Sequence, residues 1–247
     1  MYWMPSPAQS TQEPTASRRH GSPQCWGCSL MDDLLVETQL YNYSHPSVSH
    51  FTTKALVSGS NAPENQARDL YYAVRDGISY EVFGTDISQP GLRASSIVAS
   101  RRGFCLHKSI LYVTVCRRQG IPARLLAATV QNHLSTPELE ALVGGQTFLH
   151  WYTEIQINGK WVKVTPVFGQ LLCRLYGITP LEFDVDADSI HQNSNHGGEM
   201  SFLMQTRLPD SPSYESLAAL VKTHHPLMVN ETGLVPTAAA VSGSAET

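Results

Sequence analysis

The sequence predicts an α+β fold, in which two helices precede a largely antiparallel sheet. Three observations predict it. Apolar residues recur at helical spacing after Pro63, a second helical pattern runs over 105–118, and Asn158–Gly159 joins two strand-like segments as a hairpin signal. Each of these signals is local, and their order along the chain sets the order of the elements.

The first helix begins at Pro63, because proline fits the first helical turn, where its missing N–H is not needed. Its buried face consists of apolar residues at helical spacing: Ala67, Leu70, Tyr71, Val74 and Ile78. Residues 84–95, further along the chain, are expected to form a loop.

The second helix runs from Cys105 to about residue 118, and we expect it to be amphipathic. Arg117 and Arg118 lie in its last turn, where the helix dipole favours cations, and Gly120 ends it. Its buried stripe consists of Ile110, Leu111, Thr114 and Val115.

The sheet is expected from three segments. Residues 123–130 are short, apolar and bounded by turn signals, which suits a buried strand. Residues 146–157 are rich in β-branched and aromatic side chains, and residues 160–168 return beside them. Asn158–Gly159 is typical of the two-residue turn of a β-hairpin.

One folded domain is expected at 31–228. The flanking segments 1–30 and 229–247 are predicted to be disordered tails, because their Pro-, Ser-, Thr- and Ala-rich sequences show no periodicity. Within the domain, residues 132–142 form a loop that leads into a short helix. Residues 169–228 hold further helical fragments around a polar loop.

Composition excludes several classes of protein. The net charge is −4, so there is no basic excess to meet nucleic acid or an anionic membrane surface. No apolar run approaches the roughly 20 residues of a membrane span. The five cysteines are an odd number that does not resemble a disulfide framework, which favours a cytoplasmic location. Cys25 and Cys28 are interpreted as incidental cysteines of the tail.

Cys105 is the predicted nucleophile. It stands where a loop turns into a helix, so its thiol faces unpaired backbone N–H groups and the positive end of the helix dipole. Both favour the reactive thiolate, and Arg101 and Arg102 just before it are expected to lower its pKa further. For Cys116 and Cys173, inside apolar helices, we expect core packing.

His150 is the predicted base for that nucleophile. On an extended strand it shares one face with Tyr152 and Glu154, and we expect this face to line a cleft. The neighbouring hairpin strand brings Thr165 close to the level of His150, and a threonine hydroxyl can hydrogen-bond to imidazole. His107 is an alternative base on another face of the nucleophile helix.

Several ordered motifs resemble the transglutaminase-like superfamily of the papain-like cysteine enzymes, and a small single-domain microbial subgroup in particular. The resemblance covers about 40–205. The matching segments are VRDGISY (74–80), RRGFC…KSILYVTVCRRQGIPAR (101–124), NHLSTPELEAL (132–142), HWYTEI (150–155), KVTPVF (163–168) and PLEFDVDADSI (180–190).

This resemblance implies a papain-like core, in which the helix bearing the nucleophile packs on an antiparallel sheet. It implies that Cys105 is the nucleophile and His150 the base. The third position of the family's triad is commonly Asp and holds Thr165 here. The group that orients His150 is therefore left open among Thr165 and five other residues: Asn132, Glu154, Asp184, Asp186 and Asp188.

Oxyanion stabilisation is expected first from the backbone N–H of Cys105, with a second donor from Arg102, Gln146 or Trp151. A pocket role is also considered for His133. Tyr152 and Trp151 are interpreted as cleft wall and core. The polar loop with His191 and His196 lacks metal-ligand spacing, so neither a metal nor a cofactor is expected.

The predicted function is cysteine-dependent acyl transfer or hydrolysis on an amide or ester, through a thioester acyl-enzyme. The substrate would be a small molecule or a peptide, with no nucleic acid or membrane partner, and the oligomeric state is left open. The alternatives are a cyclase or tailoring acyltransferase in small-molecule biosynthesis and a non-catalytic binding module, which Thr165 at the usual Asp position motivates.

Overall fold

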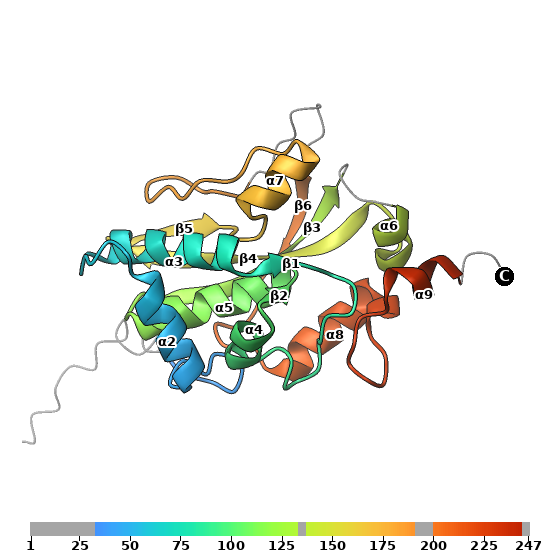
Figure 1. Ribbon diagram of the computed structural model, residues 1–247, viewed down its shortest axis with the longest axis horizontal. Coiled ribbons are helices and arrows are strands. Elements are labelled where there is room, and N and C mark those ends of the chain that lie inside the picture. The colour runs from blue at the N-terminus through green and yellow to red at the C-terminus, as the bar shows by residue number, and fades with distance from the viewer. Residues whose placement is uncertain (1–32, 133–136, 191–199, 244–247) are drawn as a thin grey trace, which may run out of the picture.

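The structure is a computed structural model that describes residues 33–132, 137–190 and 200–243. It has the predicted α+β architecture, with a cluster of helices packed on one antiparallel sheet (Figure 1). The predicted N-terminal tail, His133, His191 and His196 lie outside the described residues.

The main sheet has the strand order β5-β4-β3-β6, and every neighbouring pair is antiparallel. The four strands are β3 (Ala123–Asn132), β4 (Thr147–Ile157), β5 (Lys160–Val164) and β6 (Met200–Thr206). A second, two-stranded parallel sheet joins β1 (Ser79–Tyr80) to β2 (Arg102–Gly103), directly before the nucleophile helix.

The predicted hairpin is confirmed at Asn158–Gly159. Both residues have positive φ, +52° and +78°, as a two-residue turn that matches strand twist requires. Pairing between β4 and β5 runs from Ile157↔Lys160 only as far as Thr153↔Val164. Beyond that point Thr165 donates its N–H to the Ser189 carbonyl at 3.1 Å instead. The returning strand is therefore shorter than the predicted 160–168, and β4 keeps an open edge before Thr153.

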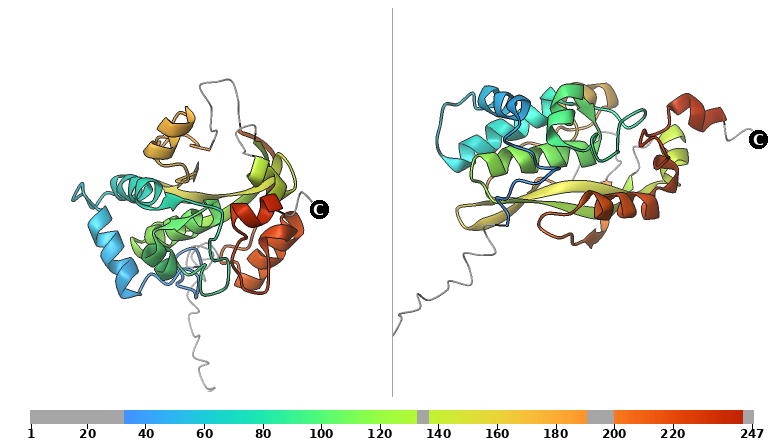
Figure 2. Two further views of the ribbon diagram at one scale, coloured as in Figure 1. Left: turned by 45° about the vertical axis from the view of Figure 1, so that its right-hand side comes forward. Right: turned by 90° about the horizontal axis from the view of Figure 1, so that it is seen from below.

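The nucleophile helix α5 (Cys105–Arg118) has the predicted bounds, yet it is not amphipathic. Its residues are buried from Cys105 through Arg117, because β3 and β4 cover one side and other helices cover the rest. These helices are α3 (Pro63–Gly77) and α4 (Ala94–Ser100), and α2 (Pro46–Ala55) packs against both of them on the same side of the sheet (Figure 2).

Burial of α5 on all sides is allowed because its charged side chains find backbone acceptors. The Lys108 Nζ donates to the carbonyls of Arg75 and Ile78, at 2.8 and 2.7 Å, where α3 ends. Arg117 donates to the Ala123 carbonyl at 3.0 Å. Helix α5 is thus the central, buried helix of the core rather than a surface helix.

The C-terminal segment differs from the predicted tail at 229–247. Val235 and Val241 are buried in the main core, and the Gly84 N–H donates to the Val235 carbonyl at 2.9 Å. Apolar residues whose spacing fits neither a helix nor a strand still pack here, so the folded core includes residues at least as far as Val241. The remaining helices are α6 (Pro137–Val143), α7 (Gln170–Tyr176), α8 (Tyr214–His224), the 3-10 turn η1 (Pro226–Met228) and α9 (Ala238–Gly243).

Helices α6, α8 and α9 gather at one end of the molecule (Figure 1). Helix α6 contacts both α9 and η1, and α8 contacts β4. Within the described ranges no helix is long and apolar enough to cross a membrane. Because α8 contacts β4, this group of helices packs beside the sheet.

The two faces of the sheet bury two separate apolar clusters. Leu149, Trp151 and Ile155 of β4 face α5 and belong to the main core, where Trp151 was predicted to lie. The opposite face carries a smaller cluster. Its members are Ala128, Val130, Tyr152 and Ile190, with Leu126, Phe148, Phe168 and Phe202 packed against them.

Candidate active site

Cys105 is the first residue of α5 and is 3% exposed. Its sulfur faces backbone N–H groups of Trp151, Leu106 and Cys105 itself, which favour the thiolate. Burial has the larger effect, however, and raises the pKa of the thiol to about 12. The expected lowering of this pKa is therefore wrong for the structure as it stands, because removal from water outweighs the helix N-terminus.

The two arginines before the nucleophile hold backbone rather than the thiol. Arg101 caps α4 in the left-handed conformation, with φ 53°, and its Nη2 donates to the Gly77 carbonyl at 3.2 Å. Arg102 is exposed and its Nη2 donates to the Gly84 carbonyl at 3.1 Å. Neither guanidinium contributes to the pKa of Cys105. Because the Arg102 guanidinium donates to the Gly84 carbonyl, it is not placed to stabilise an oxyanion at Cys105.

Cys105 meets β4 at the edge that β5 leaves open. Two N–H groups on this edge point outward: that of Trp151 faces the Cys105 sulfur, and that of Leu149 donates to His225 Nε2 at 2.9 Å. The carbonyl of Trp151 accepts from Ser109 Oγ at 3.1 Å. Residues of α5 and a distant histidine thus satisfy backbone groups that a longer β5 would have paired.

His150 lies on the other face of the sheet, opposite Ala128 of β3. Its ring is parallel to that of Tyr152, with centroids 6.5 Å apart, and meets Phe202 edge-on at 6.1 Å. At 1% exposure it is buried, so the expectation that it lines an open cleft is wrong. The smaller apolar cluster covers this face, and burial lowers the pKa of His150 to about 4.

The structure brings Cys105 beside the backbone next to His150, and no hydrogen bond joins the two side chains among the described residues. His150 Nε2 is buried and has no hydrogen-bond partner in this part of the chain. The base assignment stays a prediction that a substrate complex would test.

Thr165 faces the same side as His150. Val164 pairs with Thr153, so these two side chains share the face of the sheet that packs on α5. Successive side chains of a strand point to opposite faces, so Thr165 lies on the face of Tyr152 and His150. Thr165 Oγ1 and Tyr152 Oη are also buried without a partner in the described ranges. Three unpartnered polar atoms on one buried face are unusual, since buried polar atoms are nearly always hydrogen-bonded.

The other groups proposed to orient His150 are engaged elsewhere. Glu154 forms an ion pair with Arg124, at 2.6 Å. Asp188 accepts from the Lys163 backbone N–H at 2.9 Å. Asp186 lies 3.6 Å from Lys160 and donates its N–H to Asp184 Oδ1.

The described side chains among the remaining oxyanion and pocket candidates are not donors at Cys105. Gln146 is exposed. Asn132 ends β3, and its side chain lies outside what the structure describes. Trp151 packs its indole in the main core and offers its backbone N–H instead. Tyr152 lies on the His150 face.

His107, the alternative base, holds the loop before α4. Its Nε2 lies 2.9 Å from the Asp86 carbonyl, and burial lowers its pKa to about 4. It packs so closely on Gly103 that a Cβ there would come within 2.5 Å of the His107 Cβ. Glycine at 103 is therefore required for β2 to lead into α5.

A small cavity of about 30 Å³ adjoins Cys105. Its lining includes His225, which the sequence reasoning missed, because nothing local in 214–229 indicates contact with a helix start so far away. Ser109 was also missed, although it stands four residues after Cys105 and therefore shares its helix face.

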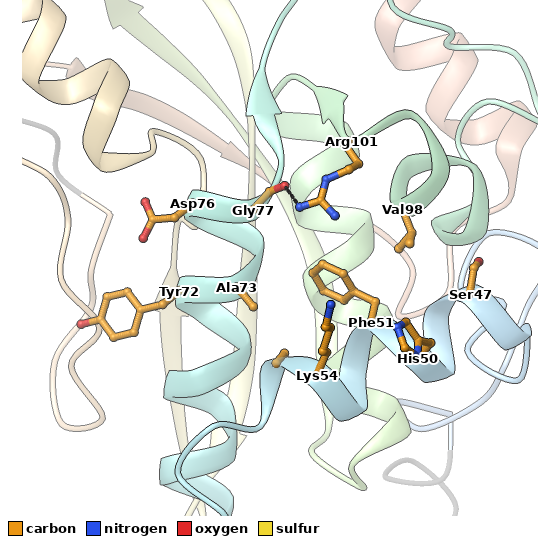
Figure 3. Close-up of a pocket in the computed structure, with 11 residues that line it drawn as sticks. Ser47, His50, Phe51, Lys54, Tyr72, Ala73, Asp76, Gly77, Val98 and Arg101 are labelled. Carbon is orange, nitrogen blue, oxygen red and sulfur yellow. Dashed lines mark hydrogen bonds between the residues drawn. The ribbon is translucent and has the colours of Figure 1, made fainter.

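A larger cavity of about 590 Å³ lies between α2, α3 and α4 (Figure 3). Phe51 and Val98 point into it, and Arg101 reaches across to the Gly77 carbonyl at its rim. Neither Cys105 nor His150 lines it. Over the described residues, no group of three His, Cys, Asp or Glu side chains is placed to hold a metal ion.

Comparison with known families gives a match over the central part of the chain. Residues 51–166 match the model of the Transglutaminase-like superfamily, which confirms the resemblance and the papain-like, transglutaminase-like fold. The matched segment contains Cys105, His150 and Thr165. A comparison with curated proteins finds no match.

Two solved structures are similar at low identity. A candidate cysteine protease from Cytophaga hutchinsonii is 18% identical with a TM-score of 0.42, covering 55% of this chain and 41% of that one. The arylamine-N-acetyltransferase from M. tuberculosis is 19% identical with a TM-score of 0.43, covering 73% and 74%. The chain thus spans less than half of the Cytophaga protein, and no residue role is taken from either.

Proposed function

Because residues 51–166 carry the core of the transglutaminase-like superfamily, whose members are typically cysteine enzymes, we propose that this protein transfers or hydrolyses acyl groups through a thioester on Cys105. The observation that supports this most is the position of the thiol. It stands at the first residue of a buried helix, facing three backbone N–H groups.

The thiol is activated during attack rather than beforehand. With a pKa raised to about 12 it is neutral at physiological pH, and His150, with a pKa near 4, is neutral as well. A neutral imidazole is the form that accepts a proton. His150 therefore acts as a general base when the Cys105 sulfur attacks the substrate carbonyl, and returns the proton to the leaving group.

Thr165 orients the imidazole in this proposal. Its hydroxyl is buried, unpartnered among the described residues and on the same face as His150, so an N–H of a protonated imidazole can donate to it. A hydroxyl offers no negative charge, so it holds the ring without raising its pKa as a carboxylate would.

The oxyanion of the tetrahedral intermediate is stabilised by main-chain N–H groups. Those of Cys105 and Trp151 already converge on the sulfur in the resting structure. The oxygen on the acyl carbon that bonds to this sulfur would lie within reach of the same donors, which need no reorganisation. Water or an amine then resolves the thioester, and the choice between them is left open.

A non-catalytic role is the second candidate, and two observations favour it. The thiol pKa is raised, and no hydrogen bond joins Cys105 to His150 among the residues described. In that case the fold would bind a ligand without covalent chemistry.

Trapping the acyl-enzyme separates the two. We expect 4-nitrophenyl acetate to release a burst of 4-nitrophenol and to add one acetyl mass, mapped to Cys105 by peptide sequencing. Cys105→Ala abolishes both signals, whereas Cys116→Ala, in the same helix, keeps them. Absence of acetyl on Cys105 in a folded protein would establish the non-catalytic alternative.

A further inference from the structure

The cavity beside Cys105 is almost wholly apolar. Its volume is about 30 Å³, and the nucleophile itself forms part of the wall. Apart from His225 and the phenol of Tyr80, the other lining side chains are apolar: they include Phe104, Leu149, Trp151, Val221 and Met228.

The far wall of this cavity comes from α6 and from the C-terminal elements α8 and η1. Val143 ends α6, Val221 lies in α8, and Met228 ends η1. His225 ties these elements to the sheet, since its Nε2 accepts from the Leu149 N–H at 2.9 Å and its Nδ1 lies 3.2 Å from the Val143 carbonyl. With both ring nitrogens engaged, His225 holds the wall in place and has no free lone pair to act as a base.

We propose that this cavity is the acyl-binding site and that it selects a short, uncharged aliphatic acyl group, whose length is limited by Met228 and Val221. This inference rests on the proposed function, because it needs a thioester on Cys105. The volume supports the size: a single water needs roughly 10–15 Å³ of such space, so about 30 Å³ holds about two non-hydrogen atoms beyond the carbonyl.

The lining supports the chemical class. No Lys, Arg, Asp or Glu side chain contributes to the cavity wall among the described residues, and the one histidine is fully engaged. A charged acyl group would lose its hydrogen bonds to water and meet no charged partner here, which disfavours its binding.

The step being tested is acyl transfer from a 4-nitrophenyl ester. The Cys105 sulfur forms a bond to the carbonyl carbon, the bond from that carbon to the phenolic oxygen breaks, and 4-nitrophenolate leaves. The thiol proton passes to His150 and then to solvent. Water later adds to the thioester, releases the carboxylic acid and restores the thiol.

The experiment compares acylation rates with the acetate, butyrate and hexanoate esters, following nitrophenol release and the intact mass of the protein. For the wild-type protein we expect acetate to acylate Cys105 at least about tenfold faster than hexanoate, after correction for each ester's reaction with free glutathione. Met228→Ala removes the thioether arm from the wall and raises the hexanoate-to-acetate ratio by about tenfold. Val221→Ala raises it in the same direction from a different element.

Two matched variants act as controls. Leu227→Ala changes the exposed neighbour of Met228 and keeps the wild-type ratio. Met228→Leu conserves volume and keeps it too. Melting curves identify any variant that fails to fold, and Val221→Ala then replaces Met228→Ala as the deciding variant.

The outcomes separate the two proposals. Acylation of Cys105 at equal rates by all esters, or unchanged ratios in both cavity variants, would overturn the acyl-site assignment and leave the proposed function standing. Absence of acyl on Cys105 with every ester would overturn both.

Discussion

The backbone N–H of Trp151 points at the sulfur of Cys105. This contact exists because β5 stops pairing with β4 after Val164, so the edge of β4 beside His150 is open to the first turn of α5. The nucleophile is therefore positioned by a gap in a β-ladder. Its neighbours on that edge, Leu149 N–H and the Trp151 carbonyl, are held by His225 and Ser109.

Alkylation of Cys105 will report its burial. Because burial raises the pKa of this thiol to about 12, the thiolate fraction, and with it the rate of iodoacetamide reaction, should rise about tenfold per pH unit between pH 7 and 9. Peptide mapping at fixed times measures the rate, with free glutathione as the reference thiol. A rate that is already level at pH 8 would show that the resting thiol has a lowered pKa and would contradict this prediction.

Acylation should depend on neutral His150. Burial lowers the pKa of this residue to about 4, so the acid limb of the acylation rate should fall near pH 4 rather than near 6.5. His150→Ala should lower the plateau rate by about 10²–10⁴-fold. Stopped-flow release of 4-nitrophenol between pH 3.5 and 8, on protein shown to be folded by circular dichroism, gives both quantities. An unchanged rate in His150→Ala would remove it as the base.

Thr165→Val tests the orienting hydroxyl, because valine has the same shape. Thr165 Oγ1 has no partner among the described residues, so replacing it should leave the free energy of unfolding unchanged or raise it by up to about 1 kcal/mol. The acylation rate should nevertheless fall about tenfold if the hydroxyl supports the imidazolium. Urea unfolding and burst kinetics on the same preparation measure the two effects. Full activity in Thr165→Val would leave His150 without this partner.

The sequence predicted those parts of the fold that local signals determine. Helix α5 begins and ends where expected, because Gly120 stops it, and the hairpin forms because Asn158 and Gly159 both tolerate positive φ. Cys105, His150 and Thr165 all lie in the segment that matches the superfamily. Residue type and order along the chain were sufficient for these features.

The rest depended on contacts between distant segments. The end of β5 is set by Ser189, which takes the Thr165 N–H, and no pattern in 160–168 shows this. Burial of His150 comes from residues such as Phe202 on another strand. The raised pKa of Cys105 follows from that kind of packing, so the helix N-terminus alone gave the wrong direction.

Stability should decrease in acid. Burial lowers the pKa values of His107 and His150 to about 4, while both would titrate near 6.5 in the unfolded chain. Between these values the unfolded state binds more protons, so stability is full above pH 6.5 and is lost as pH falls toward 4, by up to about 3 kcal/mol for each residue. Urea unfolding at pH 7 and 4.5 measures the loss. His107→Gln should make it smaller, and His50→Gln, at an exposed position, should not.

Lys108→Met tests the buried amine that joins α5 to the end of α3. The Lys108 Nζ donates to the carbonyls of Arg75 and Ile78, and methionine keeps the apolar stem but leaves both carbonyls without their donor. We expect the free energy of unfolding to fall by about 2 kcal/mol at pH 7. Lys54→Met, at an exposed position of α2, should change it by less than about 0.5 kcal/mol.

The pH dependence of that difference identifies its cause. Burial lowers the pKa of Lys108 to about 7, well below its unfolded value of 10.5. From pH 7 upward the unfolded chain therefore binds more protons than the folded one, and the wild-type protein gains stability that Lys108→Met cannot gain. The deficit of the variant should accordingly grow between pH 7 and 9 in urea unfolding. A deficit that stays constant over this range would mean that the Lys108 ammonium remains charged in the folded protein and that its contribution comes from the two hydrogen bonds to Arg75 and Ile78 alone.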